Sequence, residues 1–214
     1  MAIGRFITLE GGEGSGKTTQ ARILAERLEA TGHQAVLTRE PGGSAKAEGV
    51  RELLLSGKVK QAGPFAEAIL FSVARDDHLE QTIRPALADG KWVVCDRFAD
   101  STRAYQGVSG LRPSLINALE RLIVGRTRPD LTLVLDLAAD EGLRRAASRP
   151  PEATPVSMQD RFESMDLDFH ERLRKTFLEI ADRNARRCVI VDAHPPASTV
   201  AESIWELVVD RLHP

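Results

Sequence analysis

The sequence is poor in cysteine and in aromatic residues. Its 214 residues include two cysteines, one tyrosine and two tryptophans, and aromatic residues make up 5% of the chain. Two isolated cysteines at this spacing fit neither a zinc-binding pattern nor a disulfide framework. Because Cys95 ends one apolar run and Cys188 begins another, we expect both to be buried free thiols.

The sequence also lacks a strong net charge and a long apolar segment. A formal net charge of -2 and a pI near 6.2 argue against nucleic-acid binding through a broad basic surface. No apolar run approaches the roughly 20 residues that span a bilayer, and the chain reaches its first apolar run at Arg5 without a signal-peptide core. We therefore expect a cytoplasmic protein whose partners are small molecules, with neither nucleic acid nor a membrane among them.

Apolar runs rich in β-branched residues alternate with segments of helical periodicity. The runs cover residues 5–9, 34–38, 92–95, 131–137 and 188–192. Helices are predicted from the end of the glycine-rich stretch to about Gly32 and at residues 45–55, 64–88, 113–124, 139–147, 160–186 and 198–212. This alternation predicts an α/β fold in which helices cover both faces of a five-stranded parallel sheet, with residues 1–214 in a single domain.

The stretch "EGGEGSGKTT" follows the first apolar run and precedes the first predicted helix. It fits the pattern G-x-x-x-x-G-K-[ST], in which glycines let backbone N–H groups approach phosphate oxygens and the next helix adds its positive end. We expect it to bind ATP, with the Lys17 ammonium on the β- and γ-phosphates and the Thr18 hydroxyl on Mg²⁺. The predicted nucleotide-binding residues are Gly11, Gly12, Glu13, Gly14, Ser15, Gly16, Lys17, Thr18 and Thr19.

The motif does not reveal which molecule accepts the phosphate, but the end of another strand carries candidate residues for binding it. Asp96 and Arg97 follow the third apolar run, at the edge of an open α/β sheet where ligands bind. A carboxylate there can hold Mg²⁺, and an arginine can clamp a second phosphate group. A solvated Asp and Arg at the start of a loop is the simpler alternative.

Two further segments carry weaker signals. "TREPGG" after the second run is at the least a turn before a helix that Ser44 caps. Phe71 and Arg75 are four residues apart and so share a helix face, where an aromatic ring could stack on a base and a guanidinium could bind its carbonyl. By itself, such a pair more often reflects ordinary packing. We expect His78 to lie on the helix surface.

Taken together, "EGGEGSGKTT", "TREPGG", "FSVARDDHLEQTIRPAL", "DRFADSTRAYQG", "RPDLTLVLDL" and "DRFE" resemble the thymidylate kinases, a family of nucleoside monophosphate kinases. The resemblance runs in order from about Phe6 to Asp192. It implies a three-layer P-loop kinase that transfers the γ-phosphate of ATP to dTMP with Mg²⁺, and a homodimer for which the long helix at 64–88 is a possible surface.

The resemblance also assigns roles to residues. It implies that Arg97 grips the phosphate of dTMP, that Asp96 supports Mg²⁺ and that Glu13 contacts the deoxyribose 3'-hydroxyl or the metal region. Phe71 would stack on thymine and Arg75 would bind its carbonyl. The remaining residues implied for the acceptor are Ser101, Thr102, Tyr105 and Gln106 around the nucleoside, with Tyr105 against a ribose 2'-hydroxyl, and more weakly Arg39, Pro41 and Arg51.

Residues 148–161, "SRPPEATPVSMQDR", hold three prolines and few apolar residues and are predicted to form a mobile lid. Since residues 12–15 contain no arginine, the resemblance places the catalytic arginine in the lid, where Arg145, Arg149 and Arg161 are candidates and Arg149 is preferred. The lid is longer and richer in proline than the resemblance implies. Another nucleoside monophosphate kinase and a P-loop ATPase or regulator are the alternative functions.

Overall fold

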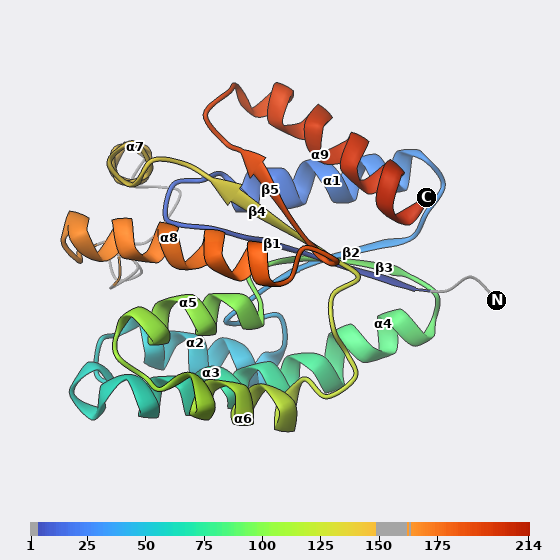
Figure 1. Cartoon of the computed structure of the whole chain (residues 1–214). Helices are drawn as coiled ribbons and strands as arrows, with labels where there is room; N and C mark the ends of the chain where they lie inside the picture. Colours follow the sequence, from blue (N-terminus) through green and yellow to red (C-terminus); the bar gives the residue numbers. More distant parts are fainter. Residues whose placement is uncertain (1–3, 149–161, 163) are drawn as a thin grey trace.

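The structure, a computed structural model, describes residues 4–148, 162 and 164–214. One parallel sheet lies at its centre, with the strand order β2-β3-β1-β4-β5 (Figure 1). The strands are β1 (Arg5–Glu10), β2 (Ala35–Arg39), β3 (Trp92–Asp96), β4 (Leu131–Asp136) and β5 (Cys188–Asp192). They confirm the predicted strands to within one residue at either end. Because β1 pairs with both β3 and β4, the crossovers diverge beside it, which is where ligands of such sheets bind.

Helices cover both faces of the sheet (Figure 1). The helical segments are α1 (Lys17–Ala30), α2 (Ala45–Leu55), η1 (Lys60–Ala62), α3 (Gly63–His78), η2 (Leu79–Ile83), α4 (Arg84–Ala88), α5 (Ala99–Val108), α6 (Pro113–Ile123), α7 (Ala139–Ala147), α8 (Leu167–Arg183) and α9 (Ala197–Leu212). Helices α1 and α9 lie on one face, and α5, α8 and α4 lie on the other. The α/β fold predicted from the sequence is confirmed.

Alternating strand residues supply the two cores. On β1, Ile7 and Leu9 are fully buried with the apolar sides of α1 and α9, while Phe6 packs on the other face with β3, η2 and α4. A third cluster joins α8 to Tyr105 on α5. A sheet buried on both faces requires strands that are apolar on both sides, and this explains the continuous apolar runs of the sequence.

Helix α5 was not predicted, because its buried side is largely polar. Asp100, Thr102 and Gln106 are all at most 5% exposed, so the helix shows no apolar stripe of period 3.6. Its N-terminus is capped from far along the chain: the Glu10 carboxylate accepts hydrogen bonds from the N–H groups of Phe98 (2.8 Å) and Ser101 (3.2 Å). A cap that lies 88 residues away in the sequence gives no local signal.

Two predicted helices have different bounds in the structure. The helix expected at 64–88 changes hydrogen-bonding register at the π-helical turn η2, which precedes Pro85, a residue without an N–H to donate. The helix expected at 160–186 begins at Leu167, because the side chain of Asp166 caps it by accepting the Phe169 N–H at 2.8 Å, and it ends at Arg183.

The structure also tests the smaller predictions about the cysteines, Gly32 and His78. Cys95 and Cys188 are buried free thiols, as predicted, and Gly32 follows α1 with a φ of 91°, which suits a helix C-terminus. The expectation that His78 lies on the helix surface is wrong, since its side chain is fully buried between α3, β2 and the loop after β2. Among the described helices, none is long and apolar enough to cross a membrane.

Candidate active site

The glycine-rich stretch forms the loop that joins β1 to the N-terminus of α1. Gly16 caps the helix in the left-handed conformation, with a φ of 88°, so that the helix N–H groups at residues 17–19 point out of its positive end. The Lys17 ammonium is folded onto the loop itself and donates to Gly12 O at 2.6 Å and Ser15 Oγ at 3.2 Å. A bound phosphate would take the place of these two contacts of the ammonium.

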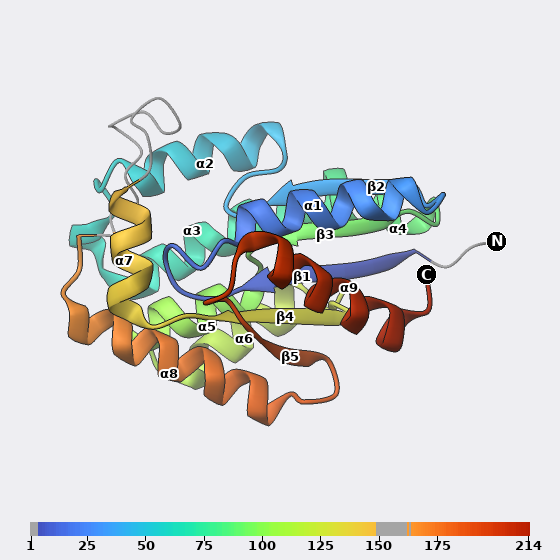
Figure 2. The same ribbon diagram turned by 90° about the horizontal axis from the view of Figure 1, so that it is seen from above.

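Helix α7 packs against this loop with no side chain between the two backbones. A Cβ atom on Gly14 would lie 2.0 Å from Gly142 O, and one on Gly142 would lie 2.4 Å from Glu13 O. Figure 2 shows α7 beside the loop between β1 and α1. Gly142 was not predicted as part of the site, because a glycine inside a helix has no local sign of such an approach.

The oxygen atoms expected to bind Mg²⁺ lie together, at the end of β3 and at the end of the phosphate loop. Thr18 Oγ1 donates to Asp96 Oδ2, and Asp96 Oδ1 is buried with no hydrogen-bond partner among the described residues. A buried carboxylate oxygen that lacks a partner is costly unless a ligand binds it. One carboxylate and one hydroxyl, completed by phosphate oxygens and water, fit the oxygen ligation that Mg²⁺ prefers.

Arg97 connects the phosphate loop to α5. Its Nη2 donates to Glu13 Oε1 at 2.9 Å, and its Nη1 donates to Tyr105 Oη at 2.9 Å and to Gly11 O at 3.3 Å. The Tyr105 hydroxyl also donates to Glu13, and Ser101 Oγ lies 3.5 Å from Arg97 Nη1. We call these residues the Arg97 cluster: Glu13, Arg97, Ser101 and Tyr105.

The Arg97 cluster holds Glu13 as a carboxylate. Burial by itself would raise the pKa of Glu13, but the charges of Arg97 and Lys17 and the hydrogen bond from Tyr105 outweigh it and lower that pKa to about 2. Burial and the neighbouring Arg97 lower the pKa of Lys17 to about 8. The site therefore places the Lys17 and Arg97 cations beside the buried Glu13 carboxylate, and such cations suit the binding of phosphate groups.

Arg75, on α3, makes a second set of contacts near the N-terminus of α5. Its Nη2 donates to Phe98 O and to Thr102 Oγ1, both at 3.1 Å, and its Nε donates to Glu40 Oε2 at 2.7 Å. Phe71, one turn earlier on α3, is half-buried and packs against the cluster that contains Tyr105. The structure thus brings both residues of the Phe71 and Arg75 pair to the neighbourhood of Arg97.

The weaker candidates are more scattered. The guanidinium of Arg39 is exposed and pairs with Glu48 at 3.1 Å, and Arg51 donates to Pro41 O at 2.8 Å. Gln106 is buried on α5, where its Nε2 lies 3.4 Å from a carboxylate oxygen of Glu67. Glu67 was not predicted to lie here, because nothing near it in the sequence distinguishes this buried acid from an exposed helix residue.

The predicted lid, residues 148–161, lies outside the described residues except for Ser148. Arg149 and Arg161 lie outside the described residues. Arg145, the third candidate, is at the end of α7 and donates to Glu141 Oε1 at 2.7 Å, to Ala193 O at 2.9 Å and to His194 O at 3.1 Å. It therefore ties α7 to the loop that follows β5.

Glu10 is a second acidic residue that the sequence analysis missed. It ends β1, is fully buried, and accepts from Ser101 Oγ at 2.6 Å in addition to the two backbone N–H groups at the start of α5. Burial and the carboxylate of Asp100 raise the pKa of Glu10 to about 7, although the hydrogen bonds from Ser101 and Phe98 and the charge of Arg97 oppose this.

This shift predicts a pH-dependent stability. A carboxyl whose pKa is higher in the folded chain stabilises the fold below its unfolded value near 4.5 and loses that contribution as the pH rises through about 7. Relative to Glu10→Gln, which does not titrate, the wild-type chain should lose on the order of 3 kcal/mol across this window. Thermal unfolding from pH 4.5 to 8 measures it, with the exposed Glu29→Gln as control. A pH-independent difference between Glu10→Gln and the wild type would contradict the assignment.

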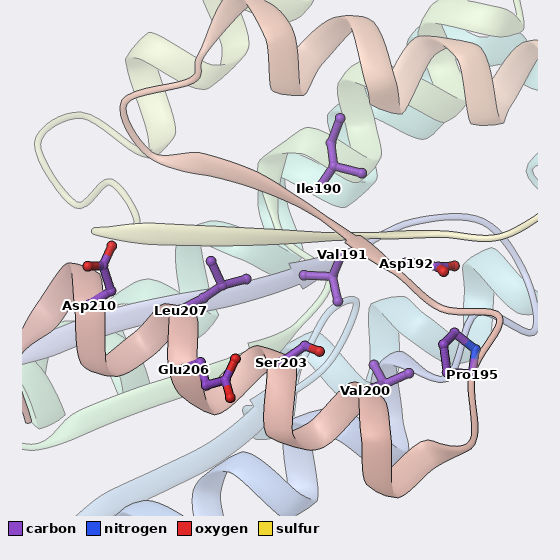
Figure 3. A pocket seen from close by; sticks show the side chains of 9 residues that line it. All are labelled: Ile190, Val191, Asp192, Pro195, Val200, Ser203, Glu206, Leu207 and Asp210. Atoms are coloured by element: carbon purple, nitrogen blue, oxygen red, sulfur yellow. The ribbon is translucent and has the colours of Figure 1, made fainter.

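A separate cavity lies at the edge of the sheet. It has a volume of about 500 Å³ and opens between β5 and α9 (Figure 3). Its lining residues are Ile190, Val191, Asp192, Pro195, Val200, Ser203, Glu206, Leu207 and Asp210. None of them belongs to the phosphate loop, the Arg97 cluster or the contacts of Arg75, so the chemistry described above does not involve it.

The phosphate loop lies beside the point where the crossovers diverge, and a partly buried arginine that follows the neighbouring strand is hydrogen-bonded to it. This arrangement defines a P-loop nucleotide-binding protein of the three-layer α/β class. Comparisons with known proteins narrow this class. A family model described as thymidylate kinase matches residues 9–204. The chain belongs to the thymidylate kinase family.

Relatives and a solved structure agree along almost the whole chain. The thymidylate kinase of Caulobacter vibrioides is 54% identical over 99% of both chains, and that of Nitrobacter hamburgensis is 52% identical over 98% of this chain and 90% of its own. The crystal structure of thymidylate kinase from Ehrlichia chaffeensis superposes with a TM-score of 0.76, at 34% identity, over 96% of this chain and 99% of that one.

Proposed function

We propose that the chain transfers the γ-phosphate of ATP to dTMP, giving dTDP and ADP. One observation carries this proposal: Arg97, which follows β3, is hydrogen-bonded to Glu13 and Gly11 of the phosphate loop. An acceptor phosphate bound by Arg97 would adjoin the terminal phosphate that the loop holds. The P-loop ATPase alternative does not explain why Tyr105 and Phe71 accompany this arginine, and membership of the family supports dTMP as the acceptor.

The proposed reaction relies on position and charge. The acceptor phosphate is already anionic, so it needs no strong general base. Lys17 and the N–H groups of the loop would hold the donor phosphates, Arg97 would hold the acceptor phosphate, and both cations would offset the charge that develops between the two. Thr18 and Asp96 would hold Mg²⁺, which when bound neutralises charge on the β- and γ-phosphates.

The acceptor nucleoside would lie along α5 and α3. We assign Phe71 to stacking on the base and Arg75 to its carbonyl oxygen, while the remaining acceptor residues of the sequence analysis, including Arg39, Pro41, Arg51 and Gln106, stay predictions. Residues 148–161 stay the predicted lid of a single domain, and Arg149 stays the predicted lid arginine. The role of Arg149 would be to place a further positive charge near the transferred phosphoryl group.

Tyr105 is proposed to select the sugar. Its ring is fixed by edge contacts with Phe162 and Phe177, at centroid distances of 4.8 and 6.2 Å, and its hydroxyl is held between Glu13 and Arg97. Tyr105→Ala should therefore reduce the preference for dTMP over its ribose counterpart by about tenfold. The ratio of kcat/KM for the two acceptors measures this, and an unchanged ratio would exclude Tyr105 from sugar selection.

A second copy of the chain is proposed to cover the outer side of α3. Phe65, Ile69 and Val73 are spaced four residues apart and are 47%, 39% and 53% exposed, so they form an apolar stripe on one face of the helix. A homodimer through α3 would bury it. Light scattering at micromolar concentration distinguishes the dimer from a monomer, and a monomeric mass would contradict the proposal.

The acceptor is tested by following ADP release with ATP and Mg²⁺, first without acceptor and then with dTMP, dUMP, UMP, CMP, AMP and GMP in turn. The proposal expects release that depends on an acceptor and is fastest with dTMP. Faster release with another monophosphate would identify a different nucleoside monophosphate kinase. Release that no monophosphate changes would favour the P-loop ATPase.

A further inference from the structure

Glu40, directly after β2, is a buried acid to which the sequence analysis gave no role. Its side chain is 5% exposed, and each carboxylate oxygen has its own partner on α3. Oε2 accepts from Arg75 Nε at 2.7 Å, and Oε1 lies 3.2 Å from His78 Nδ1. A carboxylate placed this deeply is stable only while its cation and its hydrogen bonds are kept.

His78 completes a chain of contacts that ends on β2. Its Nε2 lies 2.7 Å from Thr38 Oγ1. Because an ionised carboxylate can only accept, the proton must be on Nδ1 of His78, and in the neutral ring Nε2 then accepts from the Thr38 hydroxyl. The order of contacts is therefore Thr38, His78, Glu40 and Arg75, and we call these four residues the Glu40 chain.

The Glu40 chain limits how the Arg75 guanidinium can turn. Glu40 fixes its Nε, Phe98 O and Thr102 Oγ1 both accept from its Nη2, and its Cζ lies 5.2 Å from the centre of the Phe98 ring. The planar guanidinium fork has a defined direction only when several of its N–H groups are held. Of these contacts, the one to Nε depends on Glu40, whose own position depends on His78.

We propose that His78 and Glu40 are positioning residues for base selection, which aim Arg75 at the acceptor base. This inference rests on the proposed function. A guanidinium only donates hydrogen bonds, so a firmly held Arg75 favours a base with a carbonyl oxygen at position 4 and rejects one with an amino group there. A loosely held guanidinium could move away from the amino group, and the discrimination would fall.

Two substitutions of His78 test the contacts of its two ring nitrogens one at a time. In His78→Asn the amide nitrogen can occupy the place of Nδ1 and donate to Glu40, while the contact with Thr38 is lost. In His78→Gln the longer side chain reaches the place of Nε2 and keeps the contact with Thr38, while the donor to Glu40 is lost. Each variant removes the buried ring and one hydrogen bond, so we expect both to lose stability to a similar degree.

The readout is the ratio of kcat/KM for dTMP to that for dCMP. In His78→Gln this ratio should fall at least about tenfold, mostly through a higher KM for dTMP, because the base lies away from the reacting phosphates. In His78→Asn it should stay within about twofold of the wild type. An unchanged ratio in His78→Gln, or an equal fall in both variants, would overturn the proposal and leave His78 a merely structural residue.

Ser44→Ala is the matched control. Ser44 Oγ donates to Asp77 Oδ2 at 2.6 Å and so ties the same loop to the same helix without touching the Glu40 chain. Its loss should lower the melting temperature and leave the ratio unchanged. A fall in the ratio as large as that of His78→Gln would show that any loosening between this loop and α3 has the same effect, which would also overturn the proposal.

A measurement without substrate separates this inference from the proposed function. The Arg75 Nε–H can be followed by nitrogen-edited NMR, and its exchange with water should be slow in the wild type and in His78→Asn and at least about tenfold faster in His78→Gln. If the wild type did not phosphorylate dTMP, the proposed function would fail, while this exchange rate would still decide whether His78 holds Arg75. Equal exchange in all three proteins would overturn the inference.

Discussion

Replacing Lys17 by alanine is expected to lower kcat at least a hundredfold, which corresponds to on the order of 3 kcal/mol of lost transition-state stabilisation. The Lys17 ammonium lies in the phosphate loop, buried and bonded to Gly12 O and Ser15 Oγ. A bound phosphate would take the place of these contacts. ADP release under saturating ATP and dTMP measures the loss.

Two further variants show whether the charge of Lys17 is the cause. Lys17→Met keeps most of the side-chain length without the charge and should lose as much activity as Lys17→Ala. Lys46→Ala removes a lysine on α2 whose side chain is 85% exposed, and it should leave the rate unchanged. Turnover close to that of the wild type in Lys17→Met would show that packing, and not the ammonium, is what the loop requires.

Replacing Arg97 by alanine is expected to lower kcat by a similar factor and also to raise the KM for dTMP. Arg97 is the group that connects the acceptor side to the phosphate loop, through Glu13 and Tyr105. Its loss removes a cation from the reacting phosphates and leaves the buried Glu13 carboxylate with one fewer positive neighbour. Steady-state kinetics with dTMP as the varied substrate separate the two effects.

Because Arg97 also stabilises Glu13, the fold must be measured beside the rate. Arg97→Ala should lower the free energy of unfolding at neutral pH, since the buried carboxylate loses its partner. Arg97→Lys keeps the charge without the two-pronged geometry, and its activity should fall between those of Arg97→Ala and the wild type. Arg183→Ala, which removes a largely exposed guanidinium on α8, serves as the control. A full rate in a folded Arg97→Ala protein would exclude Arg97 from the reaction.

Features that depend on neighbours in the sequence were predicted well. The phosphate loop is a continuous motif between a strand and a helix, and the structure has that arrangement around Lys17. Asp96 and Arg97 were found because the carboxyl ends of parallel strands meet at one edge, which is a rule of topology and not of this chain. The five strands were found because a doubly covered sheet needs unbroken apolar runs.

Features that depend on buried polar contacts were missed. Glu10 caps α5 from 88 residues away, and His78 contacts Glu40 from 38 residues away. Residues of these types are usually exposed. Burying one costs little free energy only when a partner forms hydrogen bonds with it, and here the partner lies far away in the sequence. For the same reason α5 was not predicted as a helix, since its inner side presents polar groups to such partners.

The phosphate loop, the parallel sheet and the resemblance to the thymidylate kinases can all be recognised without a structure, because they depend on contiguous motifs and on the period of apolar residues. The folded chain was needed to show that Arg97 and Tyr105 hold Glu13 and that Glu40 holds Arg75. The physical reason is that a charge is stable in a protein interior only beside particular partners, and folding alone brings together partners so far apart in the chain.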